Sequence, residues 1–158
     1  MPTRDEPVGS AVEGLLAATR VLVGIASRGL EQLGDEVTIS QFRLLTVLAE
    51  HGPTSSSEVA EQLGAAGSSV TRVADRLEDA GHLVRRRERP NRSVVRLELT
   101  DSGRALVNRV MEWRRSELEG IVAQLPSADA RAVETGLWTF VEAAGHGYGA
   151  GPVELQVR

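Results

Sequence analysis

Apolar residues recur at three- and four-residue steps along most of the chain, which predicts a mainly α-helical protein. Three of the predicted helices open with a capping box, in which two side chains satisfy backbone N–H groups at the helix start. The predicted helices begin at or near Ser10, Thr38, Ser55, Ser68, Thr100 and Ser127. They end at Gly34, the HGP of 51–53, Gly64, Gly81 and Pro126, with the last running to about 145.

Between the fourth and fifth predicted helices, the spacing of apolar residues changes from three or four residues to two. Residues 82–88 (HLVRRRE) and 94–100 (VVRLELT) alternate apolar and polar positions, which is typical of a β-hairpin. Pro and Asn between them favour a turn. Two short helices joined by a tight turn and followed by a basic hairpin predict a winged helix-turn-helix.

Length and composition narrow the class of protein. With 158 residues the chain is expected to form one domain. The absence of cysteine excludes disulfides, thiolate metal sites and thiol-based redox sensing. No apolar run approaches the roughly 20 residues of a membrane-spanning helix, and the N-terminus does not resemble a signal peptide. We therefore expect a cytoplasmic protein with no membrane partner.

Positive charge is concentrated in one part of an acidic chain. The net charge is -4, and all 18 basic residues are arginine. Residues 68–99 nevertheless carry a net charge of +3, and five of the eight residues in 85–92 are arginine. A basic patch on an acidic body indicates binding to nucleic acid.

The second helix of a helix-turn-helix reads base edges in the major groove. Ser68, Arg72 and Arg76 share one face of that predicted helix, and hydroxyl groups at a helix start can bind phosphate. Arginines at the hairpin tip suit the negative minor groove. The predicted contacts to double-stranded DNA are Ser55, Ser56, Ser68, Ser69, Thr71, Arg72, Arg76, Arg85, Arg87, Arg89 and Arg92.

The segments QFRLLTVLAEHGP, SSEVAEQLG and SSVTRVADRLEDAGHLVRR resemble the MarR family of bacterial regulators, as does LT-x-x-G at 99–103. The resemblance covers residues 10–145. It implies a homodimer in which 10–34 and 104–145 form dimerisation helices. Residues 38–100 would form the DNA-binding lobe. The single domain, 10–145, would lie between a flexible N-terminus (1–9) and a glycine-rich tail (146–158).

The resemblance also implies a repressor that binds a pseudo-palindromic operator. Many family members carry Asp-Arg-Arg at the wing tip, where this chain has Asn91, Arg92 and Ser93. The central arginine is kept, so the resemblance assigns the minor-groove role to Arg92. The missing Asp removes the partner of the usual wing-anchoring ion pair.

Many members of the family release DNA when a small aromatic or anionic effector binds. The candidate effector contacts here are Phe42, Arg43, Met111 and Trp113. The three histidines lie next to glycines on different predicted elements, so we expect no metal, and no motif predicts a cofactor or catalysis. The alternative function is a winged helix whose basic hairpin binds an acidic protein partner.

Overall fold

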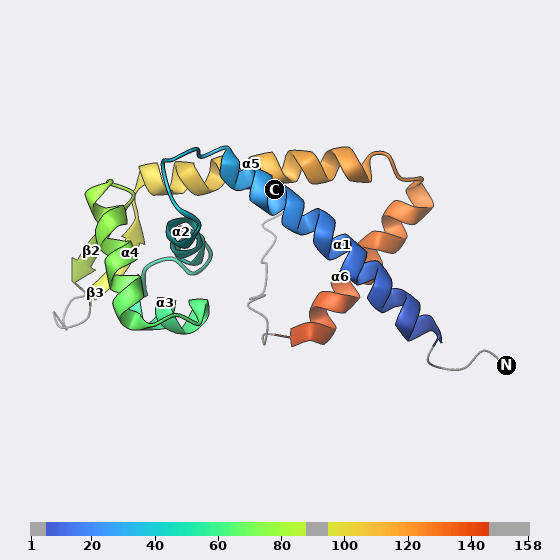
Figure 1. Cartoon of the computed structure of the whole chain (residues 1–158), viewed down its shortest axis with the longest axis horizontal. Helices are drawn as coiled ribbons and strands as arrows, with labels where there is room; N and C mark the ends of the chain where they lie inside the picture. The colour runs from blue at the N-terminus through green and yellow to red at the C-terminus, as the bar shows by residue number, and fades with distance from the viewer. Residues whose placement is uncertain (1–5, 88–94, 146–158) are drawn as a thin grey trace. The chain divides into compact units, whose positions relative to one another are not determined.

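The computed structural model describes residues 6–87 and 95–145, and its architecture is helical with a small antiparallel sheet (Figure 1). The predicted fold class, a mainly α protein with a β-hairpin in a winged helix-turn-helix, is confirmed. The helices are α1 (Glu6–Glu31), α2 (Ile39–His51), α3 (Ser56–Leu63), α4 (Gly67–Asp79), α5 (Asp101–Val122) and α6 (Ser127–Ala144). The strands are β1 (Thr54–Ser55), β2 (Leu83–Arg87) and β3 (Val95–Leu99).

The chain divides into two compact units, Met1–Glu117 and Leu118–Arg158. The boundary lies inside α5, at a position that the sequence pattern does not mark. The first unit contains the helix-turn-helix and the sheet, and every buried hydrophobic residue among those described lies within it. No residue of α6 is buried.

Capping boxes define where α2 and α3 begin, as the sequence predicts. The Thr38 hydroxyl accepts the Gln41 N–H at 3.3 Å, and the Gln41 side chain accepts the Thr38 N–H at 2.8 Å. Ser55 and Glu58 form the same reciprocal pair at the start of α3. These bonds satisfy N–H groups that have no partner within the helix.

The third predicted capping box, at Ser10, is wrong. Helix α1 begins at Glu6, so Ser10 lies inside it rather than at its start. Pro7 explains the earlier start, because proline in the first turn has a preset helical φ and lacks only an N–H that would be unpaired there. Helix α4 also begins earlier than Ser68, at Gly67, after an Ala66 that makes no side-chain cap.

The sheet contains one strand that the sequence pattern did not predict. Strands β2 and β3 form the expected hairpin, with Leu83 opposite Leu99. The two-residue strand β1 pairs with the other edge of β3, which gives the order β1-β3-β2. Two residues are too few to show a period of two. This pairing joins the start of α3 to the hairpin.

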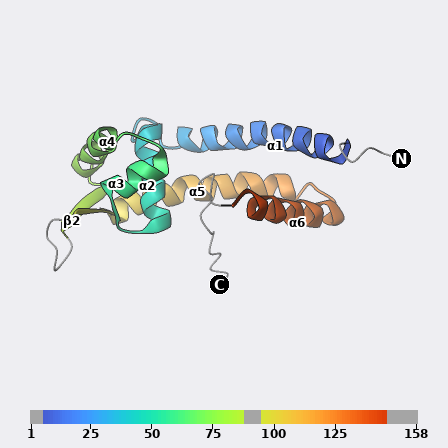
Figure 2. The same cartoon turned by 90° about the horizontal axis from the view of Figure 1, so that it is seen from below.

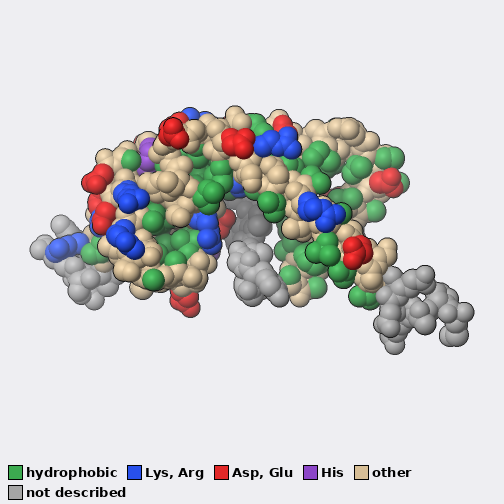
Figure 3. All heavy atoms as spheres, in the orientation of Figure 1, with side chains coloured by type: hydrophobic (Ala, Val, Ile, Leu, Met, Phe, Trp, Pro, Cys, Tyr) green, Lys and Arg blue, Asp and Glu red, His purple; other side chains and the backbone are tan. Residues whose placement is uncertain are grey.

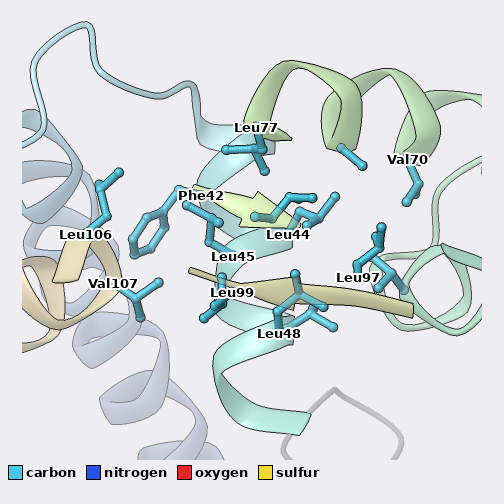
Figure 4. Packing of buried hydrophobic residues seen from close by; sticks show 14 of the residues in the cluster. Phe42, Leu44, Leu45, Leu48, Val70, Leu77, Leu97, Leu99, Leu106 and Val107 are labelled. Carbon is cyan, nitrogen blue, oxygen red and sulfur yellow. The ribbon is translucent and has the colours of Figure 1, made fainter. Parts of the chain in front are cut away.

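The core lies between α2, α4, β3 and the first half of α5 (Figure 4). Figures 1 and 2 both show α2, α3, α4 and β2 grouped at one end of the first unit. The labelled core residues are Phe42, Leu44, Leu45, Leu48, Val70, Leu77, Leu97, Leu99, Leu106 and Val107. Their burial fixes α4 against α2 with its polar face outward.

The LT-x-x-G segment forms the junction between the hairpin and α5. The Thr100 hydroxyl donates to the Gly81 carbonyl at 2.7 Å and accepts the Gly103 N–H at 3.1 Å. The Thr100 N–H donates to the His82 carbonyl at 3.2 Å. Gly103 is required because a Cβ there would lie 2.0 Å from the His82 oxygen. The motif therefore closes the turn after α4 onto the start of α5.

Helix α1 corrects one expectation about membranes. The segment Val8–Glu31 is long and apolar enough, by length and composition, to cross a membrane. Only Glu13, Arg20, Arg28 and Glu31 carry charge within it, and its many Ala, Val and Leu residues make it apolar without an unbroken run. Such a helix is weak evidence for a membrane span, because helices of soluble proteins pass the same test.

Candidate nucleic-acid interface

The polar face of α4 is the centre of the candidate interface. Val70, Ala74 and Leu77 are buried against the core, which turns the opposite face to solvent. Arginine side chains are visible over this lobe of the first unit in Figure 3. The exposed residues of α4 include Ser68, Thr71, Arg72, Asp75, Arg76 and Asp79. The second helix of the helix-turn-helix therefore exposes Ser68, Thr71, Arg72 and Arg76 of the predicted contacts, whereas Ser69 is half-buried.

Arg72 and Arg76 are available to a ligand. Both side chains are exposed, and neither forms a hydrogen bond or ion pair within residues 6–87 and 95–145. They lie four residues apart, so they project from the same side of α4. A guanidinium group donates two parallel hydrogen bonds to a phosphate or to guanine.

The hydroxyl groups in the candidate site have mixed roles. Ser55 Oγ accepts the Glu58 N–H and lies 3.1 Å from Ser57 Oγ, so it serves the α3 cap. Thr71 Oγ1 donates to the Gly67 carbonyl at 3.0 Å. Ser68 is exposed in the first turn of α4, whereas Ser56 and Ser69 are half-buried. Ser68 is thus the hydroxyl best placed to meet a phosphate.

Most hairpin arginines that the structure describes have carboxylate partners. Arg85 contacts Asp75 and Glu78, Arg86 Nε donates to Glu98 at 2.6 Å, and Arg96 lies 3.5 Å from Glu58. Arg87 is exposed at the end of β2 and has no such partner in the described parts of the chain. The predicted contacts Arg89 and Arg92, together with Asn91 and Ser93, lie outside the described residues.

The predicted effector residues do not all face one place. Phe42 is buried in the core, whereas Arg43, the next residue of α2, is exposed and donates to the Leu63 carbonyl at 3.5 Å. Arg43 lines a shallow hollow between α2, α3 and α4. Met111 is exposed and Trp113 is half-buried on α5. Arg43 therefore belongs to the helix-turn-helix side of α2.

Arg114 is a residue that the sequence analysis missed. Its guanidinium carbon lies 5.5 Å from the centre of the Phe42 ring, and Nη2 donates to the Ala26 carbonyl at 3.2 Å. Nε is buried and has no hydrogen-bond partner among the described residues, and burial lowers the pKa of Arg114. Gly29 allows this approach, because a Cβ there would lie 3.1 Å from Nε. The one signal in the sequence is its spacing, because Arg114 lies four residues after Val110 and four before Leu118, in line with the apolar positions of α5.

Metal-binding chemistry has little support in the parts of the chain that the structure describes. No group of three or more His, Asp or Glu side chains there is arranged to hold a metal ion. His51 is exposed at the end of α2, and His82 Nδ1 lies 3.0 Å from Ser102 Oγ. His146 lies outside the described residues. The expectation of no metal stays a prediction.

A helix-turn-helix with an exposed arginine pair on its second helix, followed by a hairpin wing, defines a DNA-binding protein of the winged-helix class. The model of the MarR family matches residues 37–94, which include the helix-turn-helix and most of the wing. A solved structure, RV1404 from Mycobacterium tuberculosis, is 36% identical with a TM-score of 0.80. It matches over 87% of this chain and 94% of its own. The chain belongs to the MarR family of transcription regulators.

Further similar proteins connect the family to DNA. The structure of the M. tuberculosis MarR family protein Rv2887 in complex with DNA is 28% identical, with a TM-score of 0.60. The match covers 80% of this chain and 93% of that one. The transcriptional repressor MdtR from Bacillus subtilis is 36% identical over 51% of this chain. This chain spans about half of MdtR, with 52% of its length matched.

Proposed function

We propose that the protein is a homodimeric transcription repressor that binds an inverted-repeat operator in the cytoplasm and catalyses no reaction. The observation that carries this proposal is the exposed pair Arg72 and Arg76 on α4, whose side chains have no partner within residues 6–87 and 95–145. They would contact bases or phosphates in the major groove. Ser68 would meet a phosphate at the start of the helix, and Arg87, Arg89 and Arg92 would follow the wing towards the minor groove.

The proposed homodimer is supported by apolar side chains that single chains leave exposed. Helix α6 exposes large apolar residues at three- and four-residue steps, and α1 exposes apolar residues at four-residue steps along its first four turns. Continuous exposed apolar surface marks a protein–protein interface. The exposed residues of these two helices are Val8, Val12, Leu16, Val21, Leu22, Val23, Val133, Leu137, Trp138, Phe140 and Val141.

Selection of bound duplexes from a random DNA pool tests the function. We expect enrichment of an inverted repeat whose half-sites lie about one helical turn apart. Fluorescence anisotropy with the enriched duplex should show affinity that falls with salt, with a log–log slope of about -0.9 per phosphate contacted. Failure to enrich any sequence, with only weak salt-sensitive binding, would favour the alternative role as a protein-binding module with a basic hairpin.

The repressor role needs a separate measurement, because binding alone does not fix the sign of regulation. In transcription in vitro, the amount of transcript from a promoter that carries the selected operator should decrease when the protein is added. The name of MdtR supports repression for a related sequence. Increased transcription from the same promoter would show an activator and would overturn this part of the proposal.

We also infer that a small aromatic anion releases the protein from DNA through Arg114. The buried Nε beside the Phe42 ring has no partner in the described part of the chain, so it could donate to a carboxylate while the ring contacts an aromatic group. Met111 and Trp113 lie within three residues of Arg114 on the same helix and would border such a ligand. Arg43 faces the other side of α2 and would not.

A comparison of benzoate with benzyl alcohol distinguishes binding of an anion at Arg114 from a non-specific effect of an added aromatic compound. Benzoate should weaken operator binding by the wild-type protein, and benzyl alcohol should weaken it much less because it carries no charge. Arg114→Met should lose the response to benzoate, whereas Arg115→Met, an exposed neighbour, should keep it. Equal responses of both variants would place the effector elsewhere.

A further inference from the structure

Helix α4 carries more negative than positive charge. It contains Arg72 and Arg76 but also Asp75, Glu78 and Asp79. A helix of that composition would be repelled by the phosphates on both sides of a major groove. Some other group must compensate at least part of this charge if α4 is to bind DNA.

Arg85, the third residue of β2, supplies that compensation. Its Nη2 donates to Asp75 Oδ1 at 2.6 Å, and its Nη1 donates to Glu78 Oε2. Its backbone N–H donates to the other Glu78 oxygen at 3.3 Å. Asp75 and Glu78 are three residues apart, so a single guanidinium can bridge both carboxylates on the side of α4 that faces β2.

The burial of these groups favours a persistent contact. The Arg85 side chain is 27% exposed, against 53% for Asp75 and 37% for Glu78. Burial acts to lower the pKa of Arg85, but the hydrogen bonds to Asp75 and Glu78 more than offset it, and the pKa lies above its ordinary value. Arg85 therefore stays charged. The two carboxylates together outweigh the single positive charge of Arg85, so its electrostatic attraction to a phosphate is largely cancelled.

We propose that Arg85 is a positioning residue for DNA binding, which neutralises Asp75 and Glu78 and ties α4 to the wing without contacting DNA itself. The inference rests on the proposed use of α4 as the reading helix. It differs from the expectation from sequence, in which Arg85 is one of the direct contacts. Arg72, Arg76 and Arg87 then remain as the direct contacts among the described arginines of α4 and β2.

Charge-restoring double variants test the proposal by fluorescence anisotropy on the selected operator. Arg85→Gln should weaken binding by about tenfold, in the range of coupling between neighbouring charges. Arg85→Gln with Asp75→Asn should return to within about threefold of the wild type, because removing one of the two carboxylates restores the net charge of the cluster. The matched control is Arg85→Gln with Asp79→Asn, which restores the same net charge at an exposed carboxylate that has no partner in the described segments.

Two outcomes would overturn the proposal. Equal rescue by Asp75→Asn and Asp79→Asn would mean that only net charge matters. No rescue by either, together with a salt slope lower by about 0.9, would mean that Arg85 contacts a phosphate directly. Circular dichroism melting confirms that each variant is folded at the temperature of the binding measurement.

Arg72→Ala separates failure of this inference from failure of the proposed function. If Arg72→Ala weakens binding and Arg85→Gln does not, the proposal for Arg85 is wrong and the reading helix stands. If the wild type binds the operator but Arg72→Ala has no effect, the use of α4 as the reading helix is wrong, and the proposal for Arg85 falls while operator binding itself stands. Failure of the wild type to bind any selected duplex would instead overturn the proposed function.

Discussion

At the scale of single residues, Gly103, in the first turn of α5, is the described glycine with the least room for a side chain, because it packs against the turn after α4. A Cβ there would lie 2.0 Å from the His82 carbonyl oxygen, a backbone atom that cannot move aside without breaking the turn. We expect Gly103→Ala to lower the free energy of unfolding by about 2 kcal/mol, as overpacking does in a tight site. Urea unfolding followed by circular dichroism measures the change.

Gly67→Ala is the matched control, because a Cβ at Gly67 meets nothing within 4 Å. It should change the free energy of unfolding by less than about 1 kcal/mol, in the stabilising direction that alanine has in a helix. If both variants unfold at the same urea concentration, then the Gly103 contact has no energetic consequence, and the account of LT-x-x-G given above is incorrect.

Arg72 gives the second prediction at this scale. Its exposed guanidinium has no partner among the described residues, so its loss should cost DNA contacts and nothing in the fold. We expect Arg72→Ala to weaken operator binding by about tenfold with an unchanged melting temperature. A salt slope lower by about 0.9 would identify the lost contact as a phosphate. An unchanged slope with altered sequence preference would identify a base.

At the scale of elements, α3 shows how a short helix is held by its first turn. The pKa of Glu58 is lowered, first by the hydrogen bond with the Ser55 side chain, then by the Ser55 N–H and by Arg96. A carboxylate with a lowered folded-state pKa stabilises the fold above its unfolded pKa. That contribution is lost as the pH falls through the folded-state value, so acid should loosen the start of α3.

Ser55→Ala tests this account of the α3 cap. Without the hydroxyl, the pKa of Glu58 should rise towards its ordinary value, which an NMR titration of the Glu58 carboxyl carbon measures. Ser56→Ala is the control, because Ser56 Oγ forms no hydrogen bond in the described portion of the chain. A Glu58 titration that is identical in wild type and Ser55→Ala would show that the capping bond does not hold the carboxylate.

The same elements show which parts of the structure were predictable. Signals within four residues, such as Thr38 with Gln41 or the alternation in 94–100, predicted α2, α3 and the hairpin correctly. The strand β1 was missed because its two residues have no periodicity and form a strand only against β3. The Arg85 bridge was missed for a related reason, since its partners lie seven and ten residues away and meet it only when β2 folds back beside α4.

At the scale of the whole molecule, the two helices with the largest exposed apolar surface lie near opposite ends of the chain. Phe140 and Leu137 are 49% and 47% exposed on α6, and Leu16 is 51% exposed on α1. A monomer would present this surface to water at a considerable cost. A second copy of the chain is the partner that the MarR resemblance implies, and α1 would then be covered by protein and not by lipid.

Phe140→Glu tests the proposed dimer. We expect the wild type to sediment at twice its chain mass of 16.9 kDa. A buried, unpaired carboxylate should weaken self-association by about a hundredfold, and operator affinity should fall with it because half-sites are then bound singly. Thr139→Glu introduces the same charge on the opposite, exposed face of the same helix and should remain dimeric. A wild-type protein that sediments as a monomer at micromolar concentration would contradict the dimer outright.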